Sequence, residues 1–311
     1  MNLPGALAAS TAAVLYGSAY VATAVALEGY SPSGIGVWRG LLGALLLGLL
    51  LALPPMRNQR PRGLTRAAVL RLAALGAVGG GVFILAVNTA VALSGATITA
   101  FVAGLYAVLG AVMAIPLLRE HLERWTLVAL VAAFAGTVLL SDLGASGVNI
   151  GGIGLGLVAA TAFGLFLVLS RRWSAAHGLT GPTVGLASLT ISAAFCAVVA
   201  ALDGSLLPKD PSPAATAAVA WIAVAPGAAA SVLVVIGMRR LPARFASLFL
   251  LLNPPTAALL GAVMLGERLD GGQLIGAGLV LAAIAAASGA LPARVALPRG
   301  PRPSSAPRDR P

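Results

Sequence analysis

The sequence predicts an all-α polytopic membrane protein with ten transmembrane helices in two inverted five-helix repeats. Of its 311 residues 59% are hydrophobic and 9% are charged, whereas a soluble domain has about 25% charged residues. The apolar runs are unbroken and about 20 residues long, which is the length of a helix that crosses a bilayer core. A transmembrane β-barrel would instead show segments of roughly ten residues with alternating polarity.

Ten apolar segments follow one another along the chain. They cover residues 5–27, 33–53, 70–93, 96–118, 124–141, 152–170, 180–202, 214–238, 243–265 and 271–290. No basic stretch precedes the first segment, which predicts an uncleaved helix and not a signal peptide. Residues 291–311 are rich in Pro, Arg and Ser without an apolar face, so we predict a disordered cytoplasmic tail.

The segments divide into two repeats, residues 5–141 and 152–290. In each repeat an apolar run, a short charged corner and a second apolar run follow one another, over residues 98–140 and 245–287. An offset of 147 residues places Glu120 on Glu267 and Gly79-Gly80 on Pro226-Gly227. Because one offset keeps these interruptions in register along the whole chain, we infer an internal duplication. Five spans per repeat turn the second copy upside down, as in carriers built from inverted repeats.

The distribution of basic residues predicts the orientation of the chain. If the N-terminus is cytoplasmic, 17 of the 20 Lys and Arg residues fall in inside segments, and only Lys209 and Arg268 fall outside. Such a bias predicts cytoplasmic N- and C-termini in a cell membrane. The net charge of +11 is then a result of membrane topology and does not indicate a nucleic-acid partner.

These features resemble the EamA-type family of the drug/metabolite transporter (DMT) superfamily. The similar stretches are LREHL at 118–122, LGERL at 265–269, QLIGA at 273–277 and Trp38-Arg39. The first copy departs from the pattern, with Trp125 and Val128 where the second has Gly272 and Ile275. The resemblance implies a secondary transporter of small polar metabolites such as amino acids, working as an exporter by alternating access. Carriers of nucleotide sugars or drugs and uptake permeases stay open as alternatives, and a non-transporting scaffold fits less well.

Arg39 is the one charged side chain that falls clearly inside a predicted span. A charge in the membrane interior is costly, about 2.5–3.5 kcal/mol at a helix centre, and therefore indicates a function. Its guanidinium suits a carboxylate or phosphate group on a substrate. The alternative is a structural arginine that pairs with Glu28 or with lipid head groups.

Interruptions of the spans indicate where a pathway lies. Gly80 and Pro226 occupy equivalent places in the third and eighth segments, and Asn253 precedes two prolines in the ninth, with Tyr106 as its counterpart. Paired breaks can line a midplane site, although small residues also let helices pack closely. We predict a substrate site from these residues and from polar side chains at similar depth. The predicted site residues are Arg39, Tyr16, Asn88, Tyr106, Asn253, Gly80 and Pro226; Tyr20, Trp221 and Ser231 lie at similar depth, and the first two also suit interfacial anchors.

The remaining polar residues suggest structural roles. Glu120 and Glu267, with Glu123 and Asp270, are predicted to cap helix starts. Cys196 suits a buried apolar position. The two histidines, His121 and His177, fall in predicted loops, so no enzyme, metal site or cofactor is expected. The expected partners are a small-molecule substrate and the lipid bilayer, with a homodimer left open.

Overall fold

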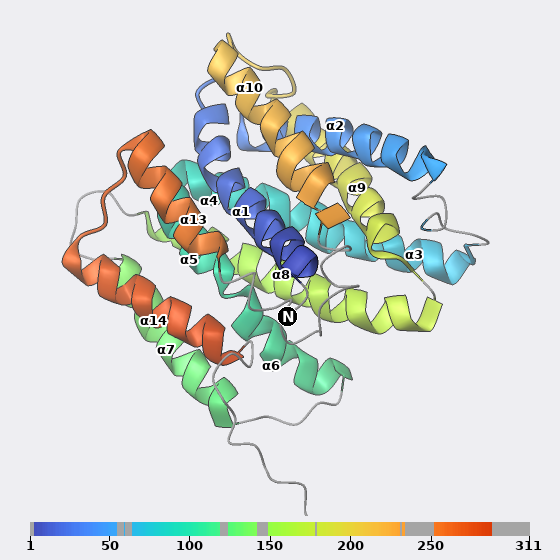
Figure 1. The fold of residues 1–311 in the computed structure, drawn as a ribbon. Coiled ribbons are helices and arrows are strands. Elements are labelled where there is room, and N and C mark those ends of the chain that lie inside the picture. Colours follow the sequence, from blue (N-terminus) through green and yellow to red (C-terminus); the bar gives the residue numbers. More distant parts are fainter. Residues whose placement is uncertain are drawn as a thin grey trace, which may run out of the picture.

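The computed structural model describes residues 3–54, 59, 64–118, 124–141, 149–177, 179–230, 232–233 and 252–287. Within these ranges the chain is helical and contains no strand (Figure 1). The elements are α1 (Leu3–Ala26), α2 (Pro32–Ala52), α3 (Arg66–Leu75), η2 (Gly76–Val82), α4 (Phe83–Ser94), α5 (Ala96–Gly104), α6 (Tyr106–Leu118), α7 (Arg124–Ser141), α8 (Ile150–His177), α9 (Gly181–Leu202), α10 (Pro213–Ile222), η3 (Ala223–Ala229), α13 (Asn253–Leu260), η4 (Gly261–Leu265) and α14 (Gly271–Ala287).

Six of the described helices are long and apolar enough to cross a membrane. They are Leu3–Ala26, Pro32–Ala52, Arg66–Ser94, Ala96–Leu118, Ile150–Ser174 and Gly181–Leu202, and two shorter apolar helices are Pro213–Ala229 and Gly271–Ala285. The predicted spans at 214–238 and 243–265 extend beyond the described residues, so the count of ten stays a prediction. Other predicted features also lie outside the described residues: the tail (291–311), Glu120, Glu123, His121 and Ser231.

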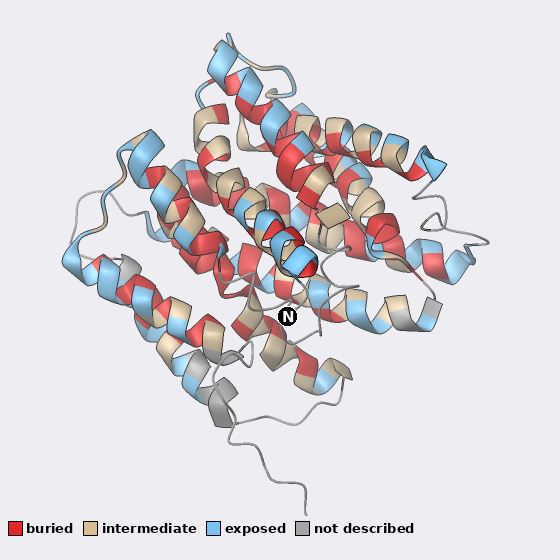
Figure 2. Ribbon diagram, viewed as in Figure 1, coloured by how far each residue is buried: buried red, intermediate tan, exposed pale blue. Residues whose placement is uncertain are grey.

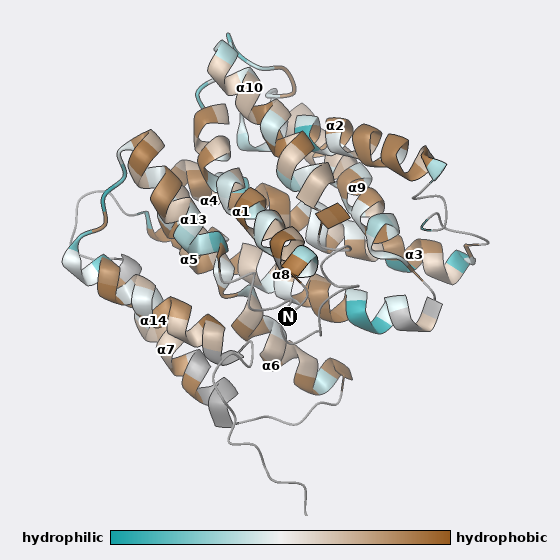
Figure 3. Ribbon diagram, in the orientation of Figure 1, coloured by the Kyte–Doolittle hydropathy of each residue, from teal (hydrophilic) through white to brown (hydrophobic). Residues whose placement is uncertain are grey.

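Large apolar side chains lie on the outer surface of the bundle as well as in its core. On α2, Leu41, Leu45 and Leu49 are 51%, 60% and 58% exposed, whereas Leu47 and Leu51 are buried. Buried residues concentrate on the helices in the middle of the bundle (Figure 2), and the exposed face of α2 is coloured as strongly hydrophobic (Figure 3). A helix that is apolar all round suits a lipid environment, because water would disfavour its outer face.

Helix boundaries confirm the 147-residue period. The first residues of α3 and α10 are 66 and 213, and those of α6 and α13 are 106 and 253. The two π-helices also correspond, η2 at 76–82 and η3 at 223–229. The chain therefore bends or widens at the same places in both repeats, although few residues are identical there.

Contacts between the repeats are reciprocal. Equivalent helices pack on each other in the pairs α2 with α9 and α7 with α14, and α7 and α14 lie side by side at one edge of the bundle (Figure 1). Likewise η2 packs on α9 while η3 packs on α2, and α6 packs on α8 while α13 packs on α1. This exchange of partners is expected when two copies of one unit are related by a two-fold axis.

Two equivalent glycines allow two of these close approaches. A Cβ atom on Gly17 of α1 would lie 2.7 Å from the carbonyl oxygen of Asn253. A Cβ atom on Gly164 of α8 would lie 2.9 Å from the carbonyl oxygen of Tyr106. Tyr106 and Asn253 are equivalent positions, and the same kind of backbone contact holds them against α8 and α1. Glycine alone leaves room for this contact.

The charged corner of the second repeat uses its two acidic residues in different ways. Asp270 and Gln273 form a reciprocal cap at the start of α14, with the Gln273 amide donating to Asp270 Oδ1 (2.8 Å) and the Asp270 amide donating to Gln273 Oε1 (3.1 Å). Glu267 instead caps α5 of the first repeat, accepting from the amides of Ala96 (2.8 Å) and Thr97 (3.0 Å). The predicted capping role is confirmed for both, but the helix that Glu267 caps belongs to the other repeat.

Candidate functional site

Arg39 lies on α2 beside the crossing of α2 and α9. The crossing is close because Gly36 and Gly40 face Cys196, Ala193 and Leu189 of α9. Helix α2 begins at a defined place, since Ser31 caps it by accepting from the Gly34 amide (2.9 Å) and Pro32 occupies its first turn. Glycines on one face of α2 and a fixed helix start therefore determine where the arginine points.

The charge of Arg39 has no acidic partner within the part of the chain that the structure describes. Its Nε atom is buried and makes no hydrogen bond there. The predicted alternative, an ion pair with Glu28, does not form, and Glu28 is exposed in the loop before α2. An arginine without an anionic partner inside a membrane helix bundle is unfavourable unless an anion from outside the chain completes it.

Two tyrosines of α1 lie within electrostatic range of this arginine. The guanidinium is close enough to Tyr16 and Tyr20 to interact with them electrostatically, and also to Cys196 of α9. Tyr106, the first residue of α6, interacts in turn with Tyr16 and Tyr20. Tyr16 and Tyr20 thus lie within electrostatic range of Arg39, and Tyr106 lies within range of these two tyrosines. Tyr20 was also predicted as an interfacial anchor.

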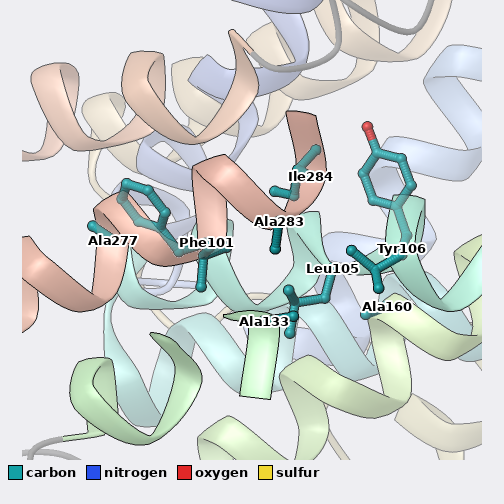
Figure 4. Close-up of a cluster of buried hydrophobic side chains, with 10 residues drawn as sticks. Phe101, Leu105, Tyr106, Ala133, Ala160, Ala277, Ala283 and Ile284 are labelled. Carbon is teal, nitrogen blue, oxygen red and sulfur yellow. The ribbon is translucent and has the colours of Figure 1, made fainter. Parts of the chain in front are cut away.

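Tyr106 joins the arginine site to an aromatic group on α4 and α8. Its ring meets Phe163 edge to face with 4.9 Å between centroids, and Phe163 stacks on Phe83 at 4.7 Å. In the apolar cluster of Figure 4, the Tyr106 hydroxyl points away from Phe101, Leu105 and their neighbours. The ring is therefore held by apolar packing on one side while its hydroxyl is directed elsewhere. Phe83 and Phe163 were not predicted as site residues, since phenylalanine in an apolar helix carries no distinguishing signal.

Asn253 starts α13 next to α1, where its backbone carbonyl meets Gly17. Its side-chain Oδ1 is buried and lacks a hydrogen bond among the described residues. Leu105 interrupts the helix between α5 and α6 just before Tyr106, and the equivalent Leu252 precedes Asn253 at the start of α13. The counterpart of the predicted break is present before Tyr106 without a proline, whereas the residues that precede Leu252 lie outside the described part of the chain.

Asn88 occupies a different environment. The side chain is buried on α4, and its Nδ2 donates to the carbonyl oxygen of Pro32 at 3.0 Å. This bond ties α4 to the first turn of α2. The structure therefore places Asn88 as a positioning residue for the helix that carries Arg39, and brings it into no described contact with the tyrosines.

Gly80 and Pro226 lie in the π-helices η2 and η3, so the predicted interruptions are real. A Cβ atom on Gly80 would meet the carbonyl group of Ser188 on α9. Pro226 is buried in η3, which packs on α2. These segments support the helices around Arg39 from both repeats through close packing. Trp221 lies nearby on α10, half-exposed, and its Nε1 donates to Ser18 Oγ at 3.0 Å.

A family match covers both repeats. The sequence model of the EamA-like transporter family matches residues 3–142 and again residues 150–289, which together make up most of the chain. The protein belongs to the EamA-like transporter family. It is accordingly a multi-pass membrane protein of the DMT type, from a family of transporters and not of enzymes. The resemblance predicted from the charged corners and Trp38-Arg39 is confirmed.

Solved structures agree with the fold of this EamA-like transporter. One, titled "Crystal structure of protein", has 19% sequence identity and a TM-score of 0.64, and the alignment covers 92% of this chain and 97% of that one. At this identity the likeness concerns the fold. No curated protein matches the sequence.

Among the described residues, no three His, Cys, Asp or Glu side chains gather where they could hold a metal ion. The predicted site residues near Arg39 contribute a guanidinium and phenol groups. These groups can bind and orient an anion by charge and hydrogen bonds.

Proposed function

We propose that this transporter is a carrier in the cytoplasmic membrane that exports a small polar or zwitterionic metabolite, such as an amino acid, by alternating access. The observation that carries the proposal is Arg39, an arginine inside a membrane helix without an acidic partner among the described residues. A carboxylate on the substrate would supply the missing negative charge, and a guanidinium can bind it through two parallel hydrogen bonds.

The surroundings of Arg39 favour a substrate with polar and apolar parts. Tyr16, Tyr20 and Tyr106 offer hydroxyl groups, and Asn253 offers a buried Oδ1 without a partner among the described residues. Phe83 and Phe163 extend the site with apolar rings. Gly80 and Pro226, within paired π-helices, hold the flanking helices. We therefore expect the site to bind organic anions or zwitterions more tightly than cationic drugs.

Reciprocal packing supports the alternating-access part of the proposal. Each repeat contacts the other through equivalent elements, η2 on α9 and η3 on α2. In an inverted pair the two repeats can exchange conformations, which opens the central site to one side and then to the other.

A ligand screen tests the substrate class. Purified protein should melt at a higher temperature with a matching amino acid or another carboxylate, by roughly 5–10 °C at a ligand concentration about 100 times Kd. Cationic drugs should leave the midpoint unchanged. Arg39→Ala should abolish the ligand shift and Arg39→Lys should retain part of it, because lysine keeps the charge but loses the two-pronged geometry.

Arg66→Ala serves as the matched control, since Arg66 is an exposed arginine at the start of α3. This variant should keep the full ligand shift. A ligand shift that survives in Arg39→Ala, or a response restricted to cationic drugs, would contradict the proposed role of Arg39.

Membrane orientation is tested separately. With Cys196→Ala as background, Lys209→Cys should react with a membrane-impermeant maleimide in intact cells, whereas Arg66→Cys should react only after permeabilisation. Both positions are exposed. The expectation rests on 17 of 20 basic residues falling on the side assigned as cytoplasmic. The reverse labelling pattern would show the opposite topology.

A further inference from the structure

A cavity whose lining does not include Arg39 lies between the two repeats. Its volume is about 480 Å³, and its walls come from α2 and α4 of the first repeat and from α8 and α9 of the second. The walls are apolar and include Leu85, Ala86, Leu155, Val158, Phe195 and Val199. Thr89 also contributes, but its hydroxyl donates to the Leu85 carbonyl (2.8 Å) and offers no hydrogen to a ligand.

The cavity reaches the outer surface of the bundle. Val82 and Val158, which line it, are 36% and 46% exposed. In a multi-pass membrane protein, an apolar outer surface of this kind is in contact with lipid chains. We therefore describe the cavity as a lateral groove.

One end of the groove carries a negative charge. Asp203 follows α9, and Ser33 lies in the first turn of α2. Asp203 accepts hydrogen bonds from the Ser205 amide (3.0 Å), from the Ser205 hydroxyl and from the Ser33 hydroxyl (3.3 Å). These bonds, that of the Ser205 hydroxyl first, lower the pKa of the Asp203 carboxyl group. The carboxylate therefore stays ionised at neutral pH.

No lysine or arginine among the described residues forms an ion pair with Asp203. Lys209 of the same loop lines a separate cavity with Glu28, and its amide donates to the Gly29 carbonyl at 3.0 Å. The charged end of the groove is thus open to a cation from outside the chain. Such an end attracts ammonium groups and disfavours anionic head groups.

From the apolar walls and the carboxylate at one end, we propose that the groove binds a phospholipid with a primary amine head group, with an acyl chain between α4, α8 and α9 and the ammonium group over Asp203. Charge complementarity selects phosphatidylethanolamine over phosphatidylglycerol. Because both repeats contribute to the walls, the bound lipid stabilises the arrangement of the repeats that the structure shows.

Native mass spectrometry of the full chain released from nanodiscs tests the proposal. With equal amounts of phosphatidylethanolamine and phosphatidylglycerol, the wild type should retain phosphatidylethanolamine in saturable adducts with about fivefold preference, the upper range for one exposed charge pair. Asp203→Asn should remove the preference while retaining lipid. Val158→Trp, which fills the groove, should reduce adducts of both lipids.

Val128→Trp provides the control, because Val128 is 52% exposed on α7, away from the groove. It should retain the wild-type adducts and their preference. Melting temperatures of all variants identify any that fail to fold. Equal retention of the two lipids by the wild type, a preference that survives Asp203→Asn, or a protein dimer in place of lipid adducts would each overturn the proposal.

Discussion

Gly40→Ala is expected to destabilise the protein by about 2–3 kcal/mol, the upper part of the range for overpacking a close contact. A Cβ atom there would lie 2.7 Å from both the Ala193 nitrogen and the Leu189 carbonyl oxygen of α9. Both are backbone atoms, so no side-chain rotation relieves the clash and the helices must separate. Thermal unfolding in detergent should show a midpoint lower by roughly 5 °C or more.

The matched control lies on the same helix. Gly48 is two turns further along α2, and nothing lies within 4 Å of the position that its Cβ would occupy. Gly48→Ala should therefore be neutral or stabilising by up to about 1 kcal/mol, because alanine is the better helix former. If Gly40→Ala and Gly48→Ala unfolded at the same temperature, the close crossing of α2 and α9 would be wrong. Since Arg39 adjoins this crossing, Gly40→Ala should also weaken ligand binding.

Removing the carboxylate of Glu267 is the second substitution with a large expected effect. Glu267→Ala leaves the Ala96 and Thr97 amides at the start of α5 without their acceptors, and a loss of about 2–3 kcal/mol is expected. The carboxylate fits between two glycines, since a Cβ on Gly95 would lie 2.8 Å from Oε1 and one on Gly261 would lie 2.6 Å from Oε2.

Two further acidic substitutions provide the comparison. Glu267→Gln keeps one carbonyl acceptor and should lose less stability than Glu267→Ala. Glu28→Ala removes an exposed carboxylate and should stay within about 0.5 kcal/mol of the wild type. Unfolding midpoints measured side by side in one detergent give the ranking. If the unfolding midpoint of Glu267→Ala equalled that of Glu28→Ala, the hydrogen bonds between Glu267 and α5 would not contribute to stability.

The repeat is the part of the fold that sequence reasoning predicted most fully. The offset of 147 residues follows from the positions of the interruptions alone, and the structure places both π-helices and the starts of α6 and α13 at that offset. The break before Tyr106 has no proline to signal it. It could be predicted only from its counterpart at Asn253-Pro254, which shows that one repeat can carry the signal for both.

The candidate site was predicted in part. Arg39 could be singled out from the sequence because a charged side chain inside an apolar run has a high free-energy cost in a membrane. Its electrostatic interaction with Tyr16 and Tyr20 depends on how α1 and α2 are placed in the bundle, which the sequence does not state. Asn88 illustrates the limit, because a buried amide at a suitable depth can face a pathway or, as here, donate to a backbone carbonyl.

The sequence by itself determined that the chain is a helical membrane protein built from two repeats. In a hydrocarbon environment, backbone groups must be paired within each segment and side chains must be apolar. The membrane helices and their repetition can therefore be recognised from local stretches of the sequence. Only the tertiary structure decided which polar groups meet. Glu267 caps a helix about 170 residues earlier in the chain, and Arg39 interacts with tyrosines of another helix. Such pairings depend on which glycines allow two helices to pack closely, and the sequence does not distinguish those glycines from the others.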